Sequence, residues 1–363
     1  TGSMTFGHGI QANNLYGMEN GIEVTLNKVP VTGVSLDKTE LSLEEGKTET
    51  LVATVSPDNA TYKDVTWSSG NTSVATVDNG VVTAVGAGST TITVTTTDGG
   101  KTATCDVTVT APSYLPGEFT INSSGTKVKF STGNLYYDAD DNTCHWKFEA
   151  NQYDFRTYND GTNQGGSCIN GTHNASSGTP TNDWGLFGWS TSASSNNWGM
   201  HIMTSPTSGY TDGTFKDWGT APGLPLPGEG KTWRTLSKDE WDYLLKRTVN
   251  GGTGEGKSYQ KATVNGVYGM ILYPDSYTAQ SLSTSYSIAD WTSMESDGAV
   301  FLPAPGRRSG TDVNVNLAGY GYYWSSSPYP GQSNNAYYMY FSSSSAYMNI
   351  DFRNYGHAVR LVR

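Results

Sequence analysis

The chain has 363 residues, a net charge of −11 and 15% charged residues, against about 25% in a typical soluble protein, whereas Gly (43) and Tyr (23) are abundant. This composition excludes a coiled coil or a largely helical protein, and the negative charge excludes nucleic acid as the partner because the phosphates would be repelled. No apolar run reaches the roughly 20 residues of a membrane-spanning helix.

The length predicts two domains, or three, at about 100–200 residues each. The first 30 residues are too few to fold alone, so residues 1–30 are expected to be an N-terminal extension or the remnant of a preceding domain. Their alternating segment at 22–26 can be a strand of such a domain or an arm that docks elsewhere, and the sequence leaves both open.

Residues 31–112 are almost free of aromatics and rich in Val and Thr. Short runs with apolar and polar residues in alternation recur every 8–12 residues or so, which is typical of a β-sandwich of immunoglobulin (Ig) type. Asp78-Asn79-Gly80 between two runs predicts a tight hairpin. The expected strands are 34–36, 41–43, 50–55, 65–67, 74–77, 80–84, 90–94 and 104–109.

Several motifs of this segment resemble the bacterial Ig-like domains of group 2: VSL at 34–36, LVATVSP at 51–57, VTWSS at 65–69, VATV at 74–77 and GAGSTTITV at 86–94. The resemblance implies a spacer or stalk module of bacterial surface proteins, without chemistry of its own. Trp67 is then expected in the core, as is Cys105, which lies in an alternating run. Cys144 and Cys168 can form a disulfide in an oxidising compartment, or remain free.

Residues 111–117 contain two prolines and predict a short, stiff linker. The domain expected after it, 118–363, is rich in Trp, Tyr, Gly, Ser and Asn. It contains one clear helix signal, because Ser237 and Glu240 form a capping box and Trp241, Leu244 and Leu245 share one helical face, with the end near residue 247. Long polar loops are expected at 157–178 and 190–230.

Four segments of this domain resemble the formylglycine-generating-enzyme-like branch of the C-type lectin fold: WRTLSKDEW at 233–241, FLPAPGRR at 301–308, GYYWSSS at 321–327 and GHAVRLVR at 356–363. They are also similar to the Fibrobacter-type major paralogous domain of Bacteroidales surface proteins and to ligand-binding domains diversified by retroelements. The expected fold class is therefore mainly β, with an N-terminal Ig-like β-sandwich and an α+β C-type-lectin-like domain with long loops.

An enzyme is not expected. No Cys follows Cys168, whereas the oxidation chemistry that the resemblance implies needs cysteines near the C-terminal end, and the five histidines show no HxxE or HxxH spacing. No GxSxG elbow occurs, and Asp290, Glu295 and Asp297 are expected in a solvated loop. We expect no catalytic residue and no cofactor.

A metal site is not expected either. The Glu-Pro-Asn and Gln-Pro-Asp tripeptides with which C-type lectins bind Ca²⁺ are absent. The acidic run at 138–142 can take a cation or form a polar turn. Ligand binding should consequently survive EDTA, and loss of binding that Ca²⁺ restores would contradict this expectation.

The C-terminal segment combines Tyr with Ser, Gly and Asn, the mixture of antibody-like binding surfaces. Trp324, Met339, Phe341 and Val359 are expected to point inward, and a Tyr-rich sheet without a ligand is the alternative. No Lys follows Lys261 and no Glu follows Glu295, which fits a hypervariable face that retroelements diversify through Asn-type codons and fits equally shared ancestry with undiversified paralogues. The expected ligand-binding residues are Tyr329, Asn334, Asn335, Tyr337, Tyr340, Tyr347, Asn349, Asp351, Arg353, Asn354, Tyr355 and His357.

Together these features predict a cell-surface adhesion protein, in which an Ig-like spacer presents a C-type-lectin-like binding domain. The partner is expected to be a protein or glycan on another cell or host surface, with no nucleic acid and no membrane span in this chain. The expected location is extracellular, on the outer surface of a bacterium, with the signal or anchor outside this chain. A structural pilus or stalk subunit that binds another subunit is the alternative, and an enzyme ranks third.

Overall fold

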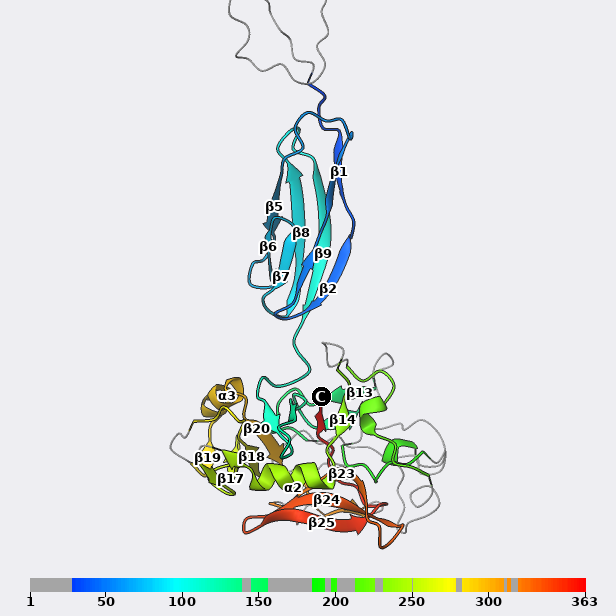
Figure 1. Cartoon of the computed structure of the whole chain (residues 1–363), viewed down its shortest axis with the longest axis vertical. Coiled ribbons are helices and arrows are strands. Elements are labelled where there is room, and N and C mark those ends of the chain that lie inside the picture. Colours follow the sequence, from blue (N-terminus) through cyan, green and yellow to red (C-terminus); the bar gives the residue numbers. More distant parts are fainter. Residues whose placement is uncertain are drawn as a thin grey trace, which may run out of the picture. The chain divides into compact units, whose positions relative to one another are not determined.

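The computed structural model describes residues 28–138, 145–155, 185–192, 197–200, 213–225, 231–249, 251–278, 283–309, 312–314 and 319–363. They divide into two compact units, Thr1–Ala111 and Pro112–Arg363. The predictions for residues 1–27, for Cys144 and Cys168, for most of the acidic run 138–142 and for loop 157–178 fall on residues outside this description. Strands dominate both units, so the mainly β prediction is confirmed (Figure 1).

The first unit is an Ig-like β-sandwich. One sheet has the order β2-β9-β8-β5, with β2 and β9 parallel, and the others are β3-β7-β6 and the pair β1-β4. Its strands are β1 (Gly33–Leu36), β2 (Glu40–Glu44), β3 (Thr48–Thr50), β4 (Ala53–Ser56), β5 (Val65–Ser69), β6 (Ala75–Asp78), β7 (Val81–Ala84), β8 (Gly88–Thr96) and β9 (Thr102–Thr110).

The sequence predictions for this unit are confirmed with one difference. Cys105 is fully buried, Trp67 packs against the core, and Asn79 and Gly80 have the positive φ angles (49° and 85°) of a tight hairpin between β6 and β7. The strand expected at 50–55 is divided, because the chain passes from the sheet of β3 to that of β4 at Leu51, whose side chain enters the core.

The second unit has two α-helices in its described part, α2 (Lys238–Lys246) and α3 (Ile288–Ser296). The capping box of Ser237 and Glu240 is present as predicted, and Trp241, Leu244 and Leu245 are buried. The helix α3 was not predicted, since residues 290–297 were expected in a solvated loop. It begins with a second capping box, formed by Ser287 and Asp290. No helix in the described part of the chain is long and apolar enough to cross a membrane.

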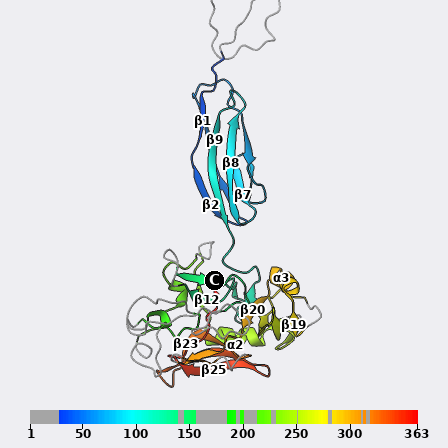
Figure 2. The ribbon, with the colours of Figure 1, turned by 180° about the vertical axis from the view of Figure 1, so that it is seen from behind.

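The larger sheets of this unit have the orders β19-β17-β18-β20 and β23-β24-β25. Figure 2 shows α2 beside β23–β25 from behind. The remaining elements are short strands and turns. The strands are β10 (Phe119–Thr120), β11 (Lys127–Val128), β12 (Leu135–Tyr137), β13 (Trp146–Phe148), β14 (Arg234–Thr235), β15 (Thr248–Val249), β16 (Gly252–Thr253), β17 (Tyr259–Val264), β18 (Val267–Leu272), β19 (Ser285–Tyr286), β20 (Val300–Pro303), β21 (Arg307–Ser309), β22 (Asp312–Asn314), β23 (Gly321–Pro328), β24 (Asn335–Phe341), β25 (Ala346–Phe352) and β26 (Leu361–Val362), and the 3₁₀ turns are η2 (Asn197–Gly199) and η3 (Trp218–Thr220).

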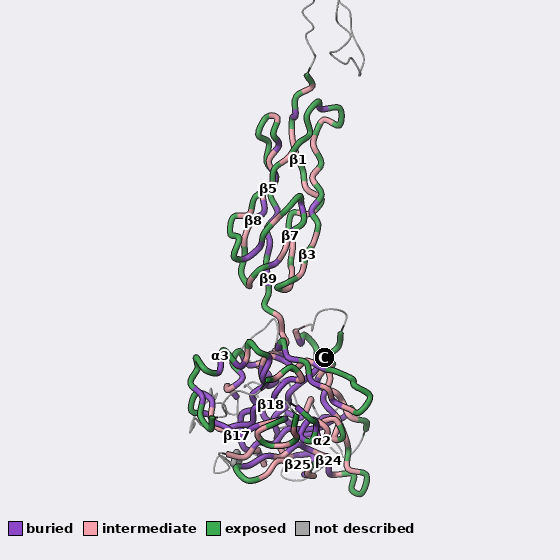
Figure 3. Tube along the Cα trace, turned by 60° about the vertical axis from the view of Figure 1, so that its left-hand side comes forward, coloured by how far each residue is buried: buried purple, intermediate pink, exposed green. Residues whose placement is uncertain are grey.

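Residues 112–117, most of the segment predicted to be a short, stiff linker, belong to the second unit. Leu115 is 5% exposed in the core beside α2, and its N–H donates to the carbonyl of Phe130 at 2.8 Å. The Tyr114 ring lies 3.4 Å from the Arg363 guanidinium. An apolar side chain in the middle of the segment therefore fixes it to the domain that follows. Figure 3 shows the buried interior of this unit around β17 and β18.

Candidate ligand-binding surface

The sheet β23-β24-β25 carries half of the twelve predicted binding residues and is covered on both faces. Side chains of a strand alternate between faces, so Met339 and Phe341 pack against α2, whereas Tyr338 joins a second core with Trp324. Trp324, Met339, Phe341 and Val359 are all buried, as predicted. Because the sheet lies between two hydrophobic cores, few of its polar side chains are fully exposed.

Five of the twelve predicted binding residues are buried, which corrects the expectation of one exposed face from Tyr329 to His357. The Arg353 guanidinium lies 4.3 Å from the Trp189 ring, and its Nε donates to the carbonyl of Asn335 at 3.0 Å. A buried polar side chain must find its partners inside the protein, so these residues serve the fold. The five are Asn335, Asp351, Arg353, Asn354 and His357.

The remaining residues do not share one face. Tyr337 pairs with Ile350 in the register of β24 and β25, and its ring lies 5.5 Å from the Lys238 ammonium at the start of α2. Tyr340, which pairs with Tyr347, points to the opposite side of the sheet. The predicted site is thus split, and Tyr329 lies with Tyr337, their ring centroids 5.5 Å apart.

A charged cluster, in which Asp351 and His357 are buried and the Arg307 side chain is 33% exposed, lies beneath the Tyr340 side. Asp351 accepts a hydrogen bond from Arg307 at 2.7 Å, and the same carboxyl oxygen lies 3.2 Å from Nε2 of His357. The His357 ring stacks on Trp324, with centroids 4.1 Å apart. Burial lowers the pKa of His357, while contacts with His357 and Arg307 outweigh burial and lower the pKa of Asp351. The cluster thus places the Asp351 carboxylate beside the neutral His357 ring, and the ion pair with Asp351 fixes the Arg307 side chain.

Around this cluster lie two groups of exposed or partly exposed side chains that meet at the buried Tyr322, together called the aromatic strip here. Ring centroids are 5.1 Å apart for Tyr340 and Tyr347 and 6.0 Å for Tyr320 and Tyr340. The Arg307 guanidinium lies 4.8 Å from the Tyr355 ring, which is 5.6 Å from Phe352. The strip consists of Arg307, Tyr320, Tyr340, Tyr347, Phe352 and Tyr355, none of which is buried.

Tyr347 and Phe352 are the most exposed residues of the strip, at 45% and 39%. Large aromatic rings and an arginine, held by neighbours that fix their rotamers, are the residue types that carry most binding energy at protein surfaces. Tyr322 joins the two halves of the strip from below, 5.5 Å from Tyr340. Burial raises its pKa to about 12, so the phenol stays neutral at physiological pH.

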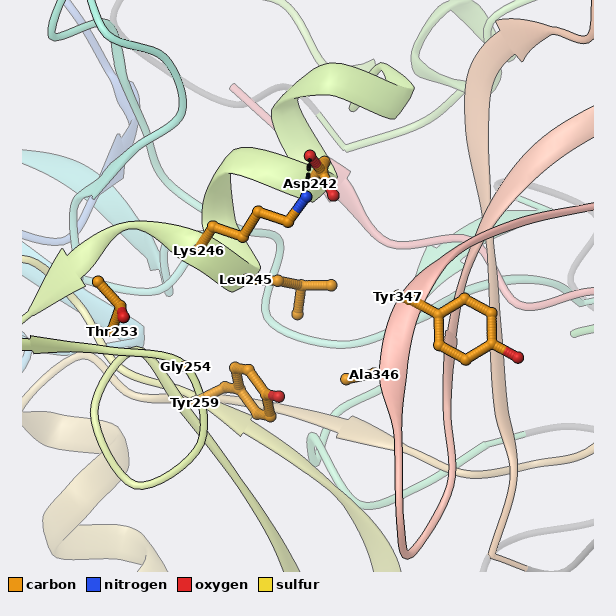
Figure 4. Close-up of a pocket in the computed structure, with 8 residues that line it drawn as sticks. All are labelled: Asp242, Leu245, Lys246, Thr253, Gly254, Tyr259, Ala346 and Tyr347. Carbon is orange, nitrogen blue, oxygen red and sulfur yellow. Dashed lines mark hydrogen bonds and ion pairs between the residues drawn. The ribbon is translucent and has the colours of Figure 1, made fainter.

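A hollow of about 270 Å³ lies on the α2 side of the same sheet (Figure 4). The side chains of Leu245, Tyr259 and Ala346 are drawn around it, and an ion pair of 2.7 Å joins Asp242 to Lys246 at its rim. The Tyr347 ring points away from it, beyond β25. The lining is completed by Thr253 and Gly254.

Within the described residues, no three His, Cys, Asp or Glu side chains lie close enough together to hold a metal ion.

Sequence analysis missed three residues of the strip: Arg307, Tyr320 and Phe352. Arg307 lies in the FLPAPGRR motif, which was used for the family resemblance, and Tyr320 directly precedes the GYYWSSS motif. Phe352 lies on the other face of β25 by alternation and reaches Tyr355 only where the strand ends. The spacing of the tyrosines could have indicated the strip, but which side chains lie beside one another depends on the strand register.

Comparison with known proteins identifies the first unit. Residues 30–107 match the family of bacterial Ig-like domains (group 2). This segment is a bacterial Ig-like domain. Residues 278–362, which contain the sheet of the aromatic strip, match a domain of unknown function (DUF8237).

The alignments with similar curated proteins cover about a quarter of this chain. An uncharacterized protein of Clostridium acetobutylicum is 46% identical over 84 residues, 23% of this chain and 9% of its own length. An alpha-L-arabinofuranosidase of Bifidobacterium longum is 45% identical over 91 residues (24% and 8%). An Ig-like virion protein of Serratia phage KSP90 is 42% identical over 93 residues (25% and 36%).

The chain spans at most about a quarter of the length of the first curated relatives it matches. Among solved structures, domains 4 and 5 of the S-layer protein SbsC are 29% identical, over 26% of this chain and 60% of that one, with a TM-score of 0.21. The Ig-like domain fits a surface protein.

Proposed function

We propose that this chain is a bacterial cell-surface adhesion protein, in which the Ig-like domain is a spacer and the second unit binds a protein or glycan on another cell. The observation that carries the proposal is the aromatic strip. It combines four tyrosines, a phenylalanine and an arginine, all exposed or partly exposed, and a partly buried ion pair holds the arginine. The proposal keeps the C-type-lectin-like assignment of the second unit and includes no catalytic step, metal or cofactor.

The strip supports adhesion because its side chains are held in place before a ligand arrives. Tyr340 contacts Tyr320, Tyr322 and Tyr347, and Arg307 is held by Asp351. A preorganised surface loses less side-chain entropy on binding, so more of the contact energy appears as affinity. An extracellular location is part of the proposal, since the Ig-like domain fits a surface protein.

The test is a double substitution of the most exposed rings, Tyr347→Ala with Phe352→Ala. Binding of the labelled full chain is measured by flow cytometry on a panel of bacterial and epithelial cells and on a glycan array. We expect a bound target for the wild type and a loss of about tenfold or more in affinity for the variant, because exposed aromatics are typical hot spots.

Tyr62→Ala is the matched control, because Tyr62 in the Ig-like domain is 53% exposed and lies outside the strip. It should bind like the wild type. Equal binding by the wild type and the double variant, with the fold intact by circular dichroism, would place the ligand site elsewhere and contradict the proposal.

A further inference from the structure

The free edge of β25 is unevenly protected. In the sheet β23-β24-β25 this strand is the last, so one row of its backbone groups faces away from β24. The Arg353 N–H donates to Asn334 at one end of the pair, and the Ser342 N–H donates to Ser345 at the other, both at 2.9 Å. Because hydrogen-bonded pairs alternate along an antiparallel ladder, the outward N–H and C=O groups are those of Ala346, Met348, Ile350 and Phe352.

Side chains cap half of this row. The Ile350 N–H donates to Oδ1 of Asn349, and the Phe352 N–H donates to Oδ1 of Asp351, both at 2.9 Å. Native proteins protect sheet edges in such ways, since an open edge pairs with other chains. The outward N–H groups of Ala346 and Met348 have no partner among the described residues. Protection therefore stops where the edge passes the hollow.

The hollow adjoins this open half. Ala346 is part of both, and Leu245 and Tyr259 supply apolar surface beside it, with Asp242 and Lys246 at the rim (Figure 4). On the other face of the same strand, Tyr347 is 45% exposed. A strand added to β25 would direct its side chains alternately to the hollow on one face of the sheet and to Tyr347 on the other.

We propose that the Ala346–Met348 edge and the hollow together bind a short extended peptide of a partner protein, added to the sheet as a further strand. The two free edge amides are about 6.8 Å apart, the two-residue repeat of an extended backbone, and a peptide offers donors and acceptors at that repeat. One apolar side chain of the peptide enters the hollow beside Leu245 and Tyr259, and its neighbour in sequence packs on Tyr347. Main-chain hydrogen bonds supply affinity and the hollow supplies selectivity, as in other cases of strand addition.

This inference deepens the proposed function and rests on it, because it names a polypeptide as the ligand class at the border of the aromatic strip. The probe is a phage-displayed library of random 12-residue peptides, selected on the immobilised full chain and counter-selected on Thr253→Trp. Thr253 is exposed and lines the hollow, so the indole fills it. Dissociation constants of the selected synthetic peptides are then measured by fluorescence anisotropy.

Two proline variants test the edge. Ala346→Pro removes an open outward N–H, and we expect it to weaken binding by about tenfold or more, as does Thr253→Trp. Ile350→Pro is the matched control, because its outward N–H is already bonded to Asn349, and binding should change by less than about twofold. Thr66→Trp, at an exposed threonine of the Ig-like domain, is the control for the hollow.

A gain of affinity provides a test that misfolding cannot imitate. Asn349→Ala frees the Ile350 N–H and lengthens the open edge, so peptides should bind severalfold more tightly, by about the contribution of one hydrogen bond. Circular dichroism and urea unfolding check the fold of every variant.

The inference would be overturned if no peptide survives counter-selection or if the two proline variants weaken binding equally. It would also fail if Ala346→Pro changes the sedimentation of the protein alone, because the edge would then bind a second copy of the chain. Glycan binding that Thr253→Trp abolishes and Ala346→Pro leaves intact would also overturn it. Loss of cell binding in the Tyr347→Ala, Phe352→Ala variant while peptides fail to bind would leave adhesion standing and reject only the peptide.

Discussion

Single buried polar residues connect distant parts of the second unit, and Gln152 is the clearest case. It is fully buried, its Nε2 donates to Glu295 at 2.8 Å and to the carbonyl of Ala299 at 3.1 Å, and its Oε1 accepts from the Phe301 N–H and the Arg360 guanidinium at 2.8 and 2.7 Å. Burial lowers the pKa of Arg360 to about 10, so it remains a cation at neutral pH. One amide thus bonds to an arginine near the C-terminus and to Glu295 in the last turn of α3.

Replacing this amide should be costly. Gln152→Leu leaves the Phe301 N–H without its partner and the Arg360 charge with the Thr132 carbonyl, 3.3 Å away, so we expect the free energy of unfolding to fall by about 3–5 kcal/mol. Urea unfolding measures it. Asn151→Leu is the control, since Asn151 is exposed and bonds only to Asp154 nearby, and its effect should stay within about 0.5 kcal/mol. Similar effects of the two variants would contradict the argument.

The buried His357 predicts a dependence of stability on pH. Burial holds its folded pKa below the ordinary value of 6.5, with Asp351 raising it and Arg307 and Arg308 lowering it to smaller extents. The unfolded chain therefore binds the proton first as pH falls, and stability present above pH 6.5 is lost below it. The Asp351 pKa lies below its ordinary 3.8, so its own contribution is lost only in stronger acid.

Urea unfolding at a series of pH values tests this. The decline in the free energy of unfolding just below pH 6.5 should be shallower in His357→Phe, which keeps an aromatic ring against Trp324 and has no proton to bind. An unchanged decline in this variant would assign the pH dependence to other groups.

At the scale of elements, α3 shows how a short polar sequence forms a helix. Its apolar face contains only Trp291 and Met294, too few for periodicity to predict it. The Ser287 hydroxyl accepts from the Asp290 N–H at 3.2 Å, and the Asp290 carboxylate accepts from the Ser287 N–H at 3.1 Å. The cap fixes the first turn, and the packing of Trp291 against Phe301 stabilises the rest.

Removal of this cap should destabilise the unit measurably. Ser287→Ala should lower the free energy of unfolding by about 1 kcal/mol, the usual contribution of a serine cap. Ser296→Ala, in the exposed last turn of the same helix, is the control and should change it by less than about 0.5 kcal/mol. Thermal and urea unfolding measure both, and equal effects would show that the cap adds nothing here.

For the whole molecule, the boundary between the units determines which fragment is stable. The sequence predicted a domain from residue 118, whereas Leu115 fills a place in the core and Tyr114 stacks on Arg363. A fragment of residues 112–363 should therefore fold, and 118–363 should be less stable by about 2–4 kcal/mol, the usual loss for a large buried apolar side chain.

Circular dichroism and urea unfolding of the two fragments test this boundary. Ser113→Ala in the longer fragment is a control, because it changes the same segment and keeps the side chains of Tyr114 and Leu115. Equal stability of 112–363 and 118–363 would show that the segment contributes little.

The sequence alone determined much of this protein. Period-2 alternation and the Asn79-Gly80 turn specify the Ig-like strands, because residues adjacent in the sequence show which side chains of a strand face the core. The capping box of Ser237 and the apolar face of Trp241, Leu244 and Leu245 likewise specify α2. Such signals are local, so they can be read without knowing the fold.

Only the tertiary structure decided the candidate site. Alternation separates Tyr337 from Tyr340 but does not say that both sides of β24 are covered. Packing against Trp189 and Trp324 of the second core buries Arg353 and His357. The partner strand and its register placed Tyr340 beside Tyr347 and left the Ala346 edge open. The exposure of a side chain and the pairing of a strand depend on residues far apart in the sequence, so a local sequence pattern does not predict them.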